Sequence, residues 1–140
     1  MEKIQFDSGM KSYRINGNGV LRFHPGDPNL YQRCLDAVEK FRALEQEMIA
    51  ASAQEGQILT CMQEADRKMK ELLGWVFGPG NDFDKILEGV NLLAVADNGE
   101  RIITNLLQAL EPVLLEGAKR CAEGKTQQAR QKAQARRDAQ

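Results

Sequence analysis

The stretch INGNGVLRFHPGDPN, from Ile15 to Asn29, marks the change from strands to helices in the predicted fold. It holds two successive Asn-Gly steps, and Asn-Gly favours a tight hairpin because both central residues of a type I′ turn need positive φ. We expect two or three short antiparallel strands, over about residues 3–7, 11–16 and 19–23. The repeated Asn-Gly step leaves the register of the hairpin open by two residues.

The end of the same stretch predicts the start of a long helix. Asp27 is a good N-cap residue, and Pro28 suits the first helical position because the N–H that it lacks would have no helical partner there. Apolar residues then recur at spacings of three and four over residues 30–50, which predicts an amphipathic helix. A similar stripe over residues 59–76 predicts a second helix, folded back on the first. One bent helix is the alternative.

The helix-ending and turn residues later in the chain predict two further helices. The segment GWVFGPG, residues 74–80, ends the second helix. Asn81 or Asp82 can cap a short helix after it. A final helix is expected beyond the turn at residues 97–99, and Pro112 should bend or restart it, since proline removes a hydrogen bond and clashes with the preceding turn.

Charge divides the chain into an acidic body and a basic tail. Residues 1–118 carry 12 Lys and Arg against 18 Asp and Glu, a net charge of −6, whereas residues 119–140 carry 7 against 2, a net charge of +5. Residues 124–140 contain no large apolar residue, and so polar a helix is marginal in water, so we expect this tail to be frayed or disordered. The predicted fold is mainly α (α+β). A single domain over residues 1–123 holds a short antiparallel β-hairpin, about residues 3–23, followed by a four- to five-helix bundle and then the basic C-terminal tail.

Composition also bears on location. No run of about 18 apolar residues appears, so we expect no membrane association. The start, MEKIQFDSG, lacks the apolar core of a signal peptide, which predicts a cytoplasmic protein. The three cysteines, Cys34, Cys61 and Cys121, are odd in number and far apart. They are therefore expected to be reduced, mostly buried thiols and not a disulfide framework.

No catalytic or cofactor-binding pattern is complete in this sequence. His24 is the only histidine, and despite the nearby Asp27 we interpret it as a surface residue at a strand end. The cysteines lack the paired spacing of a zinc site. Neither Gly17-x-Gly19 nor the segment GKT at 124–126 completes a nucleotide-binding motif. We expect no enzymatic activity, no cofactor and no metal.

Aromatic residues and methionines are candidate partner-binding groups. Aromatic side chains around Gly-Pro-Gly can anchor a partner, although such residues more often close the end of a core. Methionine repacks against varied partners at little cost, with core filling as the alternative. The candidate residues are Trp75, Phe77, Phe83, Met48, Met62 and Met69.

The basic tail is the second candidate interaction site. Its cations could contact phosphates, but no aromatic residue is interleaved with them for base stacking, which disfavours nucleic acid as a partner. A solubilising tail, or a tail that docks on an acidic protein surface, is the alternative. The tail residues concerned are Lys125, Arg130, Lys132, Arg136 and Arg137.

The order of these features resembles that of a known family. A short hairpin leads through Phe23 and a Pro-x-Asp-Pro-Asn helix start into a long Glu/Lys-rich helix pair. A Phe77-Gly78 element, a short Asp/Phe helix and a final helix with a proline near its end follow. This succession is similar to the small tail assembly chaperones of long-tailed bacteriophages and related prophage proteins. The resemblance covers roughly residues 1–122 and rests on element order and turn motifs.

The resemblance implies a non-enzymatic protein of the bacterial cytoplasm. Such chaperones coat the aggregation-prone tape-measure protein and help to recruit tail-tube subunits, which makes these two proteins the expected partners. We also expect a homo-oligomer, because self-association adds avidity along a long client. The family often makes a longer, frameshifted product, and this chain would then be the short form. The alternatives are a structural tail or head–tail component of the phage particle, or a nucleic-acid-binding accessory protein that uses the basic tail.

Overall fold

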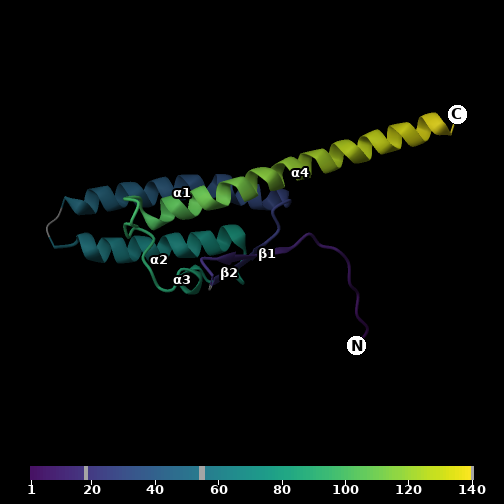
Figure 1. Ribbon diagram of the computed structural model, residues 1–140. Helices are drawn as coiled ribbons and strands as arrows, with labels where there is room; N and C mark the ends of the chain where they lie inside the picture. Colours follow the sequence, from purple (N-terminus) through teal and green to yellow (C-terminus); the bar gives the residue numbers. More distant parts are fainter. Residues whose placement is uncertain (18, 54–55, 140) are drawn as a thin grey trace.

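The structure is a computed structural model that describes residues 1–17, 19–53 and 56–139, with the side chains of all of these except residues 52 and 124–131. The predicted fold class is confirmed, because an antiparallel hairpin near the N-terminus precedes a series of helices (Figure 1). In chain order the elements are β1 (Lys11–Ile15), β2 (Gly19–Phe23), α1 (Pro28–Ser52), α2 (Ile58–Phe77), α3 (Phe83–Ile86) and α4 (Ile102–Asp138).

The first Asn-Gly step decides the hairpin register. Asn16 and Gly17 have φ values of 50° and 89°, a conformation that Asn and Gly adopt at little cost. Ile15 consequently pairs with Gly19. A Cβ atom on Gly19 would lie 2.6 Å from the carbonyl oxygen of Ile86, so only glycine lets β2 approach α3 this closely.

The strand expected over residues 3–7 is not formed. Residues 1–10 leave the sheet as an arm without regular structure, and β1 and β2 make a two-stranded sheet (Figure 1). Alternation of apolar residues makes a segment competent to form a strand but supplies no neighbour for it. In this chain the side chain of Asp7 accepts a hydrogen bond from the Gly9 N–H at 3.0 Å, which turns the backbone just before β1.

A row of four aromatic rings in contact joins the β-hairpin to the helices. The ring of Phe23 lies 5.2 Å from that of Tyr13 and 5.0 Å from that of Phe77, and Phe77 continues to Phe83 at 5.8 Å. Each of these pairs adds about 1 kcal/mol beyond the apolar area that it buries. The hairpin is therefore held against the C-terminal end of α2 and against α3.

The helix starts follow the predicted capping chemistry. The carboxylate of Asp27 accepts a hydrogen bond from the Asn29 N–H at 2.9 Å, and Pro28 occupies the first turn of α1. Asp82 caps α3 in the same way.

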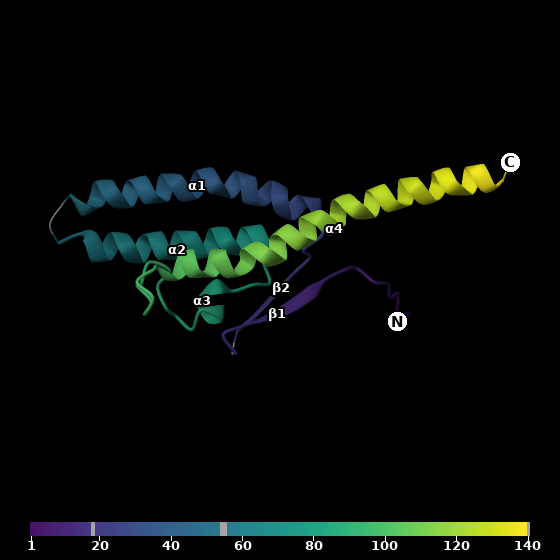
Figure 2. The same cartoon turned by 45° about the horizontal axis from the view of Figure 1, so that its top comes forward.

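Residues 28–77 form two separate helices, α1 and α2, which lie antiparallel and side by side in both views (Figures 1 and 2). The alternative of one bent helix is wrong.

Helix α4 is one continuous helix and is longer than expected. It runs through Pro112 without restarting, and it continues past Gly124 to Asp138, where the sequence predicted a frayed or disordered tail. Its first half lies along the α1–α2 pair, and its second half extends away from the body (Figure 2). Within the described ranges, no helix is both long enough and apolar enough to cross a membrane.

Candidate functional site

The end of the α1–α2 pair that carries their connection projects beyond α3 and the start of α4 (Figures 1 and 2). Here the side chains of Ile58 and Leu59 are 45% and 72% exposed, and that of Ile49 is 61% exposed. We call these three residues the hairpin tip, where hairpin means the α1–α2 helix pair and not the β1–β2 sheet. Single exposed apolar residues are common, but several at the end of a projecting helix pair indicate a surface that meets a partner.

Two of the predicted methionines lie just behind the hairpin tip. Met48 of α1 and Met62 of α2 are half-buried and pack on the edge of the core. A small gap of about 70 Å³ between the helices is bordered by Met48 and Cys61. Because methionine has flexible torsions and a polarisable sulfur, this part of the helix pair can repack when another helix approaches. Met69, by contrast, is buried in the core.

Trp75 provides a second exposed apolar surface, at the other end of α2. Its side chain is 44% exposed, and the Lys40 ammonium nitrogen lies 4.7 Å from the ring centroid, within cation–π range. A hollow of about 400 Å³ opens between α1 and α2 beside the ring, with an apolar floor and a charged rim. We call this hollow the Trp75 face. It is bordered by Lys40, Ala43, Leu44, Lys68, Glu71, Leu72 and Trp75.

The other two predicted aromatic residues are part of the core. Phe77 and Phe83 are buried; the ring of Phe77 meets Phe23 edge to face and Phe83 at a tilt. Their interpretation as residues that close the end of the helical core is confirmed. Of the three aromatic residues proposed as anchors, Trp75 is the one that a partner can reach without opening the fold.

An ion-pair cluster centred on a buried lysine lies between α2 and α3. The Lys70 ammonium is 8% exposed and lies 2.9 Å from a carboxylate oxygen of Asp66 and 2.7 Å from one of Asp84. Burial alone would lower the pKa of Lys70, but hydrogen bonds and charge attraction from Asp84 and Asp66 outweigh burial and raise it. Asp66 also accepts a hydrogen bond from the Leu92 N–H at 2.7 Å. The Lys70 charge is thus fully compensated, and the cluster positions α3 and the segment after it.

Sequence reasoning missed this cluster, although a signal was present. Asp66 and Lys70 are four residues apart, which is the spacing of many solvated helix pairs. However, Lys70 follows Met69 on the apolar side of α2, whose next turn is buried at Leu73. A lysine at the border of an apolar stripe needs a carboxylate partner if it is to be buried.

His24 has a structural place in the turn before α1. Its Nδ1 accepts a hydrogen bond from the Gly26 N–H at 3.0 Å, and the backbone of Gly9 lies against its ring. Asp27 is engaged as the α1 cap and does not orient the imidazole. Cys34, Cys61 and Cys121 are free and half-buried, and burial raises the pKa of the Cys34 thiol. Among the described residues, no group of His, Cys, Asp and Glu has the arrangement of a metal site.

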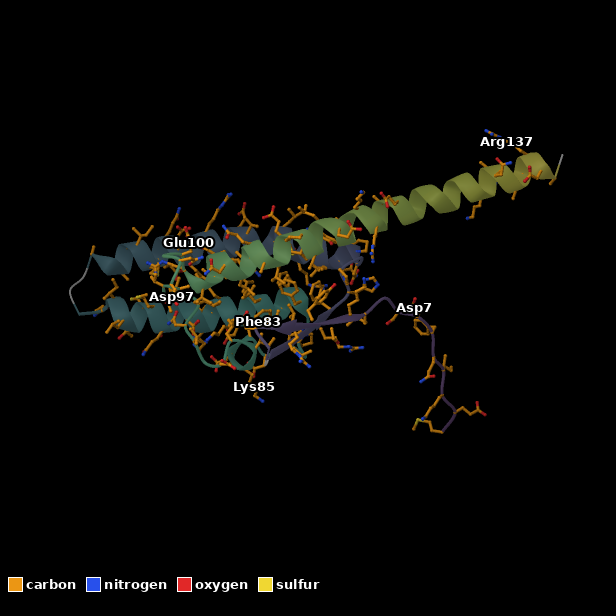
Figure 3. All side chains as sticks on the ribbon, in the orientation of Figure 1. Asp7, Phe83, Lys85, Asp97, Glu100 and Arg137 are labelled. Atoms are coloured by element: carbon orange, nitrogen blue, oxygen red, sulfur yellow. The ribbon has the colours of Figure 1, made fainter. Side chains whose placement is uncertain are left out.

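The cations of the basic tail lie on the projecting half of α4. Lys132, Arg136 and Arg137 are exposed, and Arg137 is labelled near the end of the helix in Figure 3. The side chains of Lys125 and Arg130 lie outside those that the structure describes. The described cations are spread along the outer part of one helix, an arrangement that supplies general electrostatic attraction.

No family model, no curated protein and no solved structure matches the chain. The described residues combine two exposed apolar surfaces on one helix pair, the hairpin tip and the Trp75 face, with a projecting basic helix.

Proposed function

We propose that the protein is a non-enzymatic tail assembly chaperone-like protein of a long-tailed phage or prophage. In this proposal it binds the tape-measure protein and assists tail-tube assembly in the cytoplasm of the bacterial host. The observation that carries the proposal is the projecting α1–α2 pair with its exposed hairpin tip. A protein that holds a long helical client needs apolar side chains that are accessible before the client arrives.

The two surfaces suit an amphipathic client helix. Such a helix binds a groove through apolar residues spaced three and four apart. The Trp75 face offers an aromatic anchor and an apolar floor, while Lys68 and Glu71 on its rim can orient charged client residues. Met48 and Met62 adapt the neighbouring helix surface to clients of different sequence.

Weak contacts of this kind favour coating over permanent binding. Each surface is small, so one copy should bind one client segment weakly and release it readily. Several copies that associate along a tape-measure protein gain avidity from their linkage and cover its apolar length together. This is the reason to expect a homo-oligomer as the active form.

The proposal is tested by a tagged pull-down from host cells during phage or prophage induction, with mass spectrometry of partners and of finished particles. The expected result is a tape-measure or tail-tube partner in the lysate and absence of this protein from the particles. Abundant, stoichiometric presence in particles would replace the chaperone by a structural tail or head–tail component. Nucleic acid as the only co-purifying species, lost on deletion of residues 124–140, would move the function to the basic tail.

A matched pair of variants tests whether the hairpin tip carries the binding. Leu59→Asp places a charge on the tip, and Leu115→Asp makes the same change at a residue of similar exposure, 63%, on α4. We expect Leu59→Asp to lose the tape-measure partner and Leu115→Asp to keep it. Equal recovery of the partner with both variants would remove the tip from the proposal.

A further inference from the structure

An open hollow lies beside the outer edge of the hairpin. It measures about 530 Å³, a size typical of pockets that enclose apolar ligand groups. Its walls come from β1, from the turn between β2 and α1, and from the middle of α4, and they are mostly apolar. They include Lys11, Tyr13, Pro25, Val113, Gly117 and Cys121.

The edge of β1 next to this hollow is open. β1 pairs with β2 on one side, and no strand among the described residues pairs with its other side. An open edge presents free N–H and C=O groups that can pair with another strand. Tyr13, on the apolar face of β1, faces the hollow, so a strand added at this edge would place every second side chain over it.

The N-terminal arm has the pattern of such a strand. Ile4 and Phe6 alternate with polar residues and are 90% and 80% exposed. Two apolar side chains two residues apart lie on the same face of a strand. An arm that carries them into solvent leaves apolar surface to be buried elsewhere.

In the structure the arm leads away from the hollow of its own chain. Asp7 is labelled in Figure 3 at the point where the arm has left the body. Gly9 has a φ of 79°, and its backbone lies so close to His24 that a Cβ atom would be 2.5 Å from the imidazole Nε2. The hydrogen bond from the Gly9 N–H to Asp7 and that from the Met10 N–H to Ser8, at 3.4 Å, hold this outward turn.

We propose that the arm of one copy pairs with β1 of a second copy, as a third strand over residues 3–7. Ile4 and Phe6 then fill the second copy's hollow. When both copies donate their arms, the exchange is symmetric and closes as a dimer. The proposal explains why the sequence carries a strand pattern at residues 3–7 that the single chain leaves unused.

Charge favours the arm over β1 itself as the strand that pairs with β1. β1 carries Lys11 and Arg14 and no acid, so two β1 strands side by side would bring like charges together. In the arm, Glu2 and Asp7 outnumber Lys3. Unlike a second copy of β1, the arm thus brings carboxylates to the basic edge that it covers.

Disulfide trapping tests the proposal, because Cys121 lines the hollow. In a Cys34→Ser, Cys61→Ser background, Phe6→Cys adds a thiol on the arm face that enters the hollow, and Gln5→Cys adds one on the opposite face. Under mild oxidation we expect Phe6→Cys to give a dimer joined through Cys121, identified by peptide mass spectrometry. Joining of the arm to Cys121 within one chain, or no more dimer than Gln5→Cys gives, would overturn the proposal.

A second measurement leaves the cysteines native. Sedimentation equilibrium is compared between the native chain, Phe6→Asp and Val20→Asp, where Val20 is an exposed apolar residue on the outer side of β2. We expect Phe6→Asp to raise the dimer Kd by about tenfold or more, as at an anchor residue of an interface, and Val20→Asp to leave it unchanged. A native chain that stays monomeric, or a dimer that Phe6→Asp does not weaken, contradicts arm exchange.

Arm exchange between copies does not depend on binding of the client. Arm exchange concerns self-association alone, and the arm lies at the opposite end of the molecule from the hairpin tip (Figure 1). The trapping experiment can thus fail while a tape-measure partner is found, and the reverse outcome is equally distinguishable.

Discussion

The hydroxyl of Tyr31 lies 2.6 Å from the carbonyl oxygen of Leu114, a residue 83 positions later in the chain. The same hydroxyl lies 2.5 Å from the carbonyl oxygen of Pro25, so the first turn of α1, the turn before it and the middle of α4 meet at one group. Gly117 permits this meeting, because a Cβ atom there would lie 2.0 Å from the Pro25 oxygen. We call this contact the Tyr31 junction.

Gly117→Ala should destabilise the protein although alanine is the better helix former. Helix propensity favours the substitution by about 1 kcal/mol. The methyl group, however, overlaps the rigid backbone of Pro25 and must push α4 away, which should destabilise by about 2 kcal/mol or more. Urea unfolding measures the difference in free energy of unfolding.

Gly74→Ala in α2 is the matched control. A Cβ atom there would lie 3.4 Å from the nearest atom, the Asn81 carbonyl oxygen, which is an ordinary contact distance. This variant should be as stable as the native chain or slightly more stable. If the free energies of unfolding of Gly117→Ala and Gly74→Ala are equal, α4 does not pack tightly against the Pro25 backbone at Gly117.

Tyr31→Phe removes the hydroxyl from the junction and should lower the free energy of unfolding by about 1–2 kcal/mol at neutral pH. Burial, followed by the neighbouring Cys34 and Cys121, raises the pKa of Tyr31. A raised pKa means that the folded state holds the phenol proton more tightly than the unfolded chain does. This contribution to stability is complete below about pH 10 and is lost as the pH rises through the folded pKa. The unfolding curves of Tyr31→Phe and the native chain should therefore differ at pH 8 and converge as the pH is raised above 10.

Lys70→Met should be among the more damaging single changes in the chain. It leaves the Asp66 carboxylate, whose side chain is 16% exposed, without its cation, and breaking such a pair destabilises by about 3 kcal/mol. Asp84→Asn is the milder comparison, because Asp84 is 66% exposed and Lys70 keeps Asp66, so the expected loss is below about 1 kcal/mol. Equal losses for the two variants in chemical denaturation would contradict this ranking.

Exchange of backbone amides should divide α4 into two halves. The first half is anchored by buried Leu106 and Leu110, whereas residues 124–138 carry a polar sequence with no large apolar residue to pack, so their helix depends on propagation from the packed half. We expect hydrogen exchange to be slow before residue 118 and progressively faster toward Asp138. A synthetic peptide of residues 124–140 should show little helix by circular dichroism. Uniform protection along the whole of α4 would show that the second half is stabilised on its own.

Trp75 is the only tryptophan, so its fluorescence reports on the Trp75 face directly. Titration with a peptide from the tape-measure protein should shift the emission to shorter wavelength as the ring leaves water. Trp75→Ala should weaken binding of a labelled peptide by about tenfold or more, as expected for an aromatic anchor, in a protein that circular dichroism shows to be folded at the assay temperature. Unchanged affinity would place the client elsewhere on the molecule.

The sequence predicts the local features of this fold well, because they depend on side chains close in the chain. Asp27 caps α1 and Asp82 caps α3 as their chemistry requires. The register left open by the repeated Asn-Gly step is set by the turn at Asn16 and Gly17, and it places Gly19 against Ile86 of α3. That contact is tertiary and leaves no local pattern.

The candidate site was less predictable for the same reason. Trp75 and Phe77 lie two positions apart in α2 and therefore on different faces of the helix; Phe77 packs on Phe23 and is buried, while Trp75 meets solvent. The alternation of apolar residues at 3–7 predicts a strand, but it does not identify the strand that would pair with it or the copy of the chain to which that strand belongs. In the sequence, Lys70 is one more charged residue of an amphipathic helix, and its burial depends on α3, which places Asp84 beside it.

The separation between Tyr31 and Leu114 also bears on the order in which the chain folds. α1 and α2 are joined by a short connection, so their mutual contacts close small loops, whereas the Tyr31 junction closes a long one. We expect the helix pair to form early and α4 to be seated late. Substitutions at Tyr31 or Gly117 should then accelerate unfolding and leave the refolding rate nearly unchanged in stopped-flow measurements. The junction would thus govern how long the native state lasts, and the helix pair how quickly it is reached.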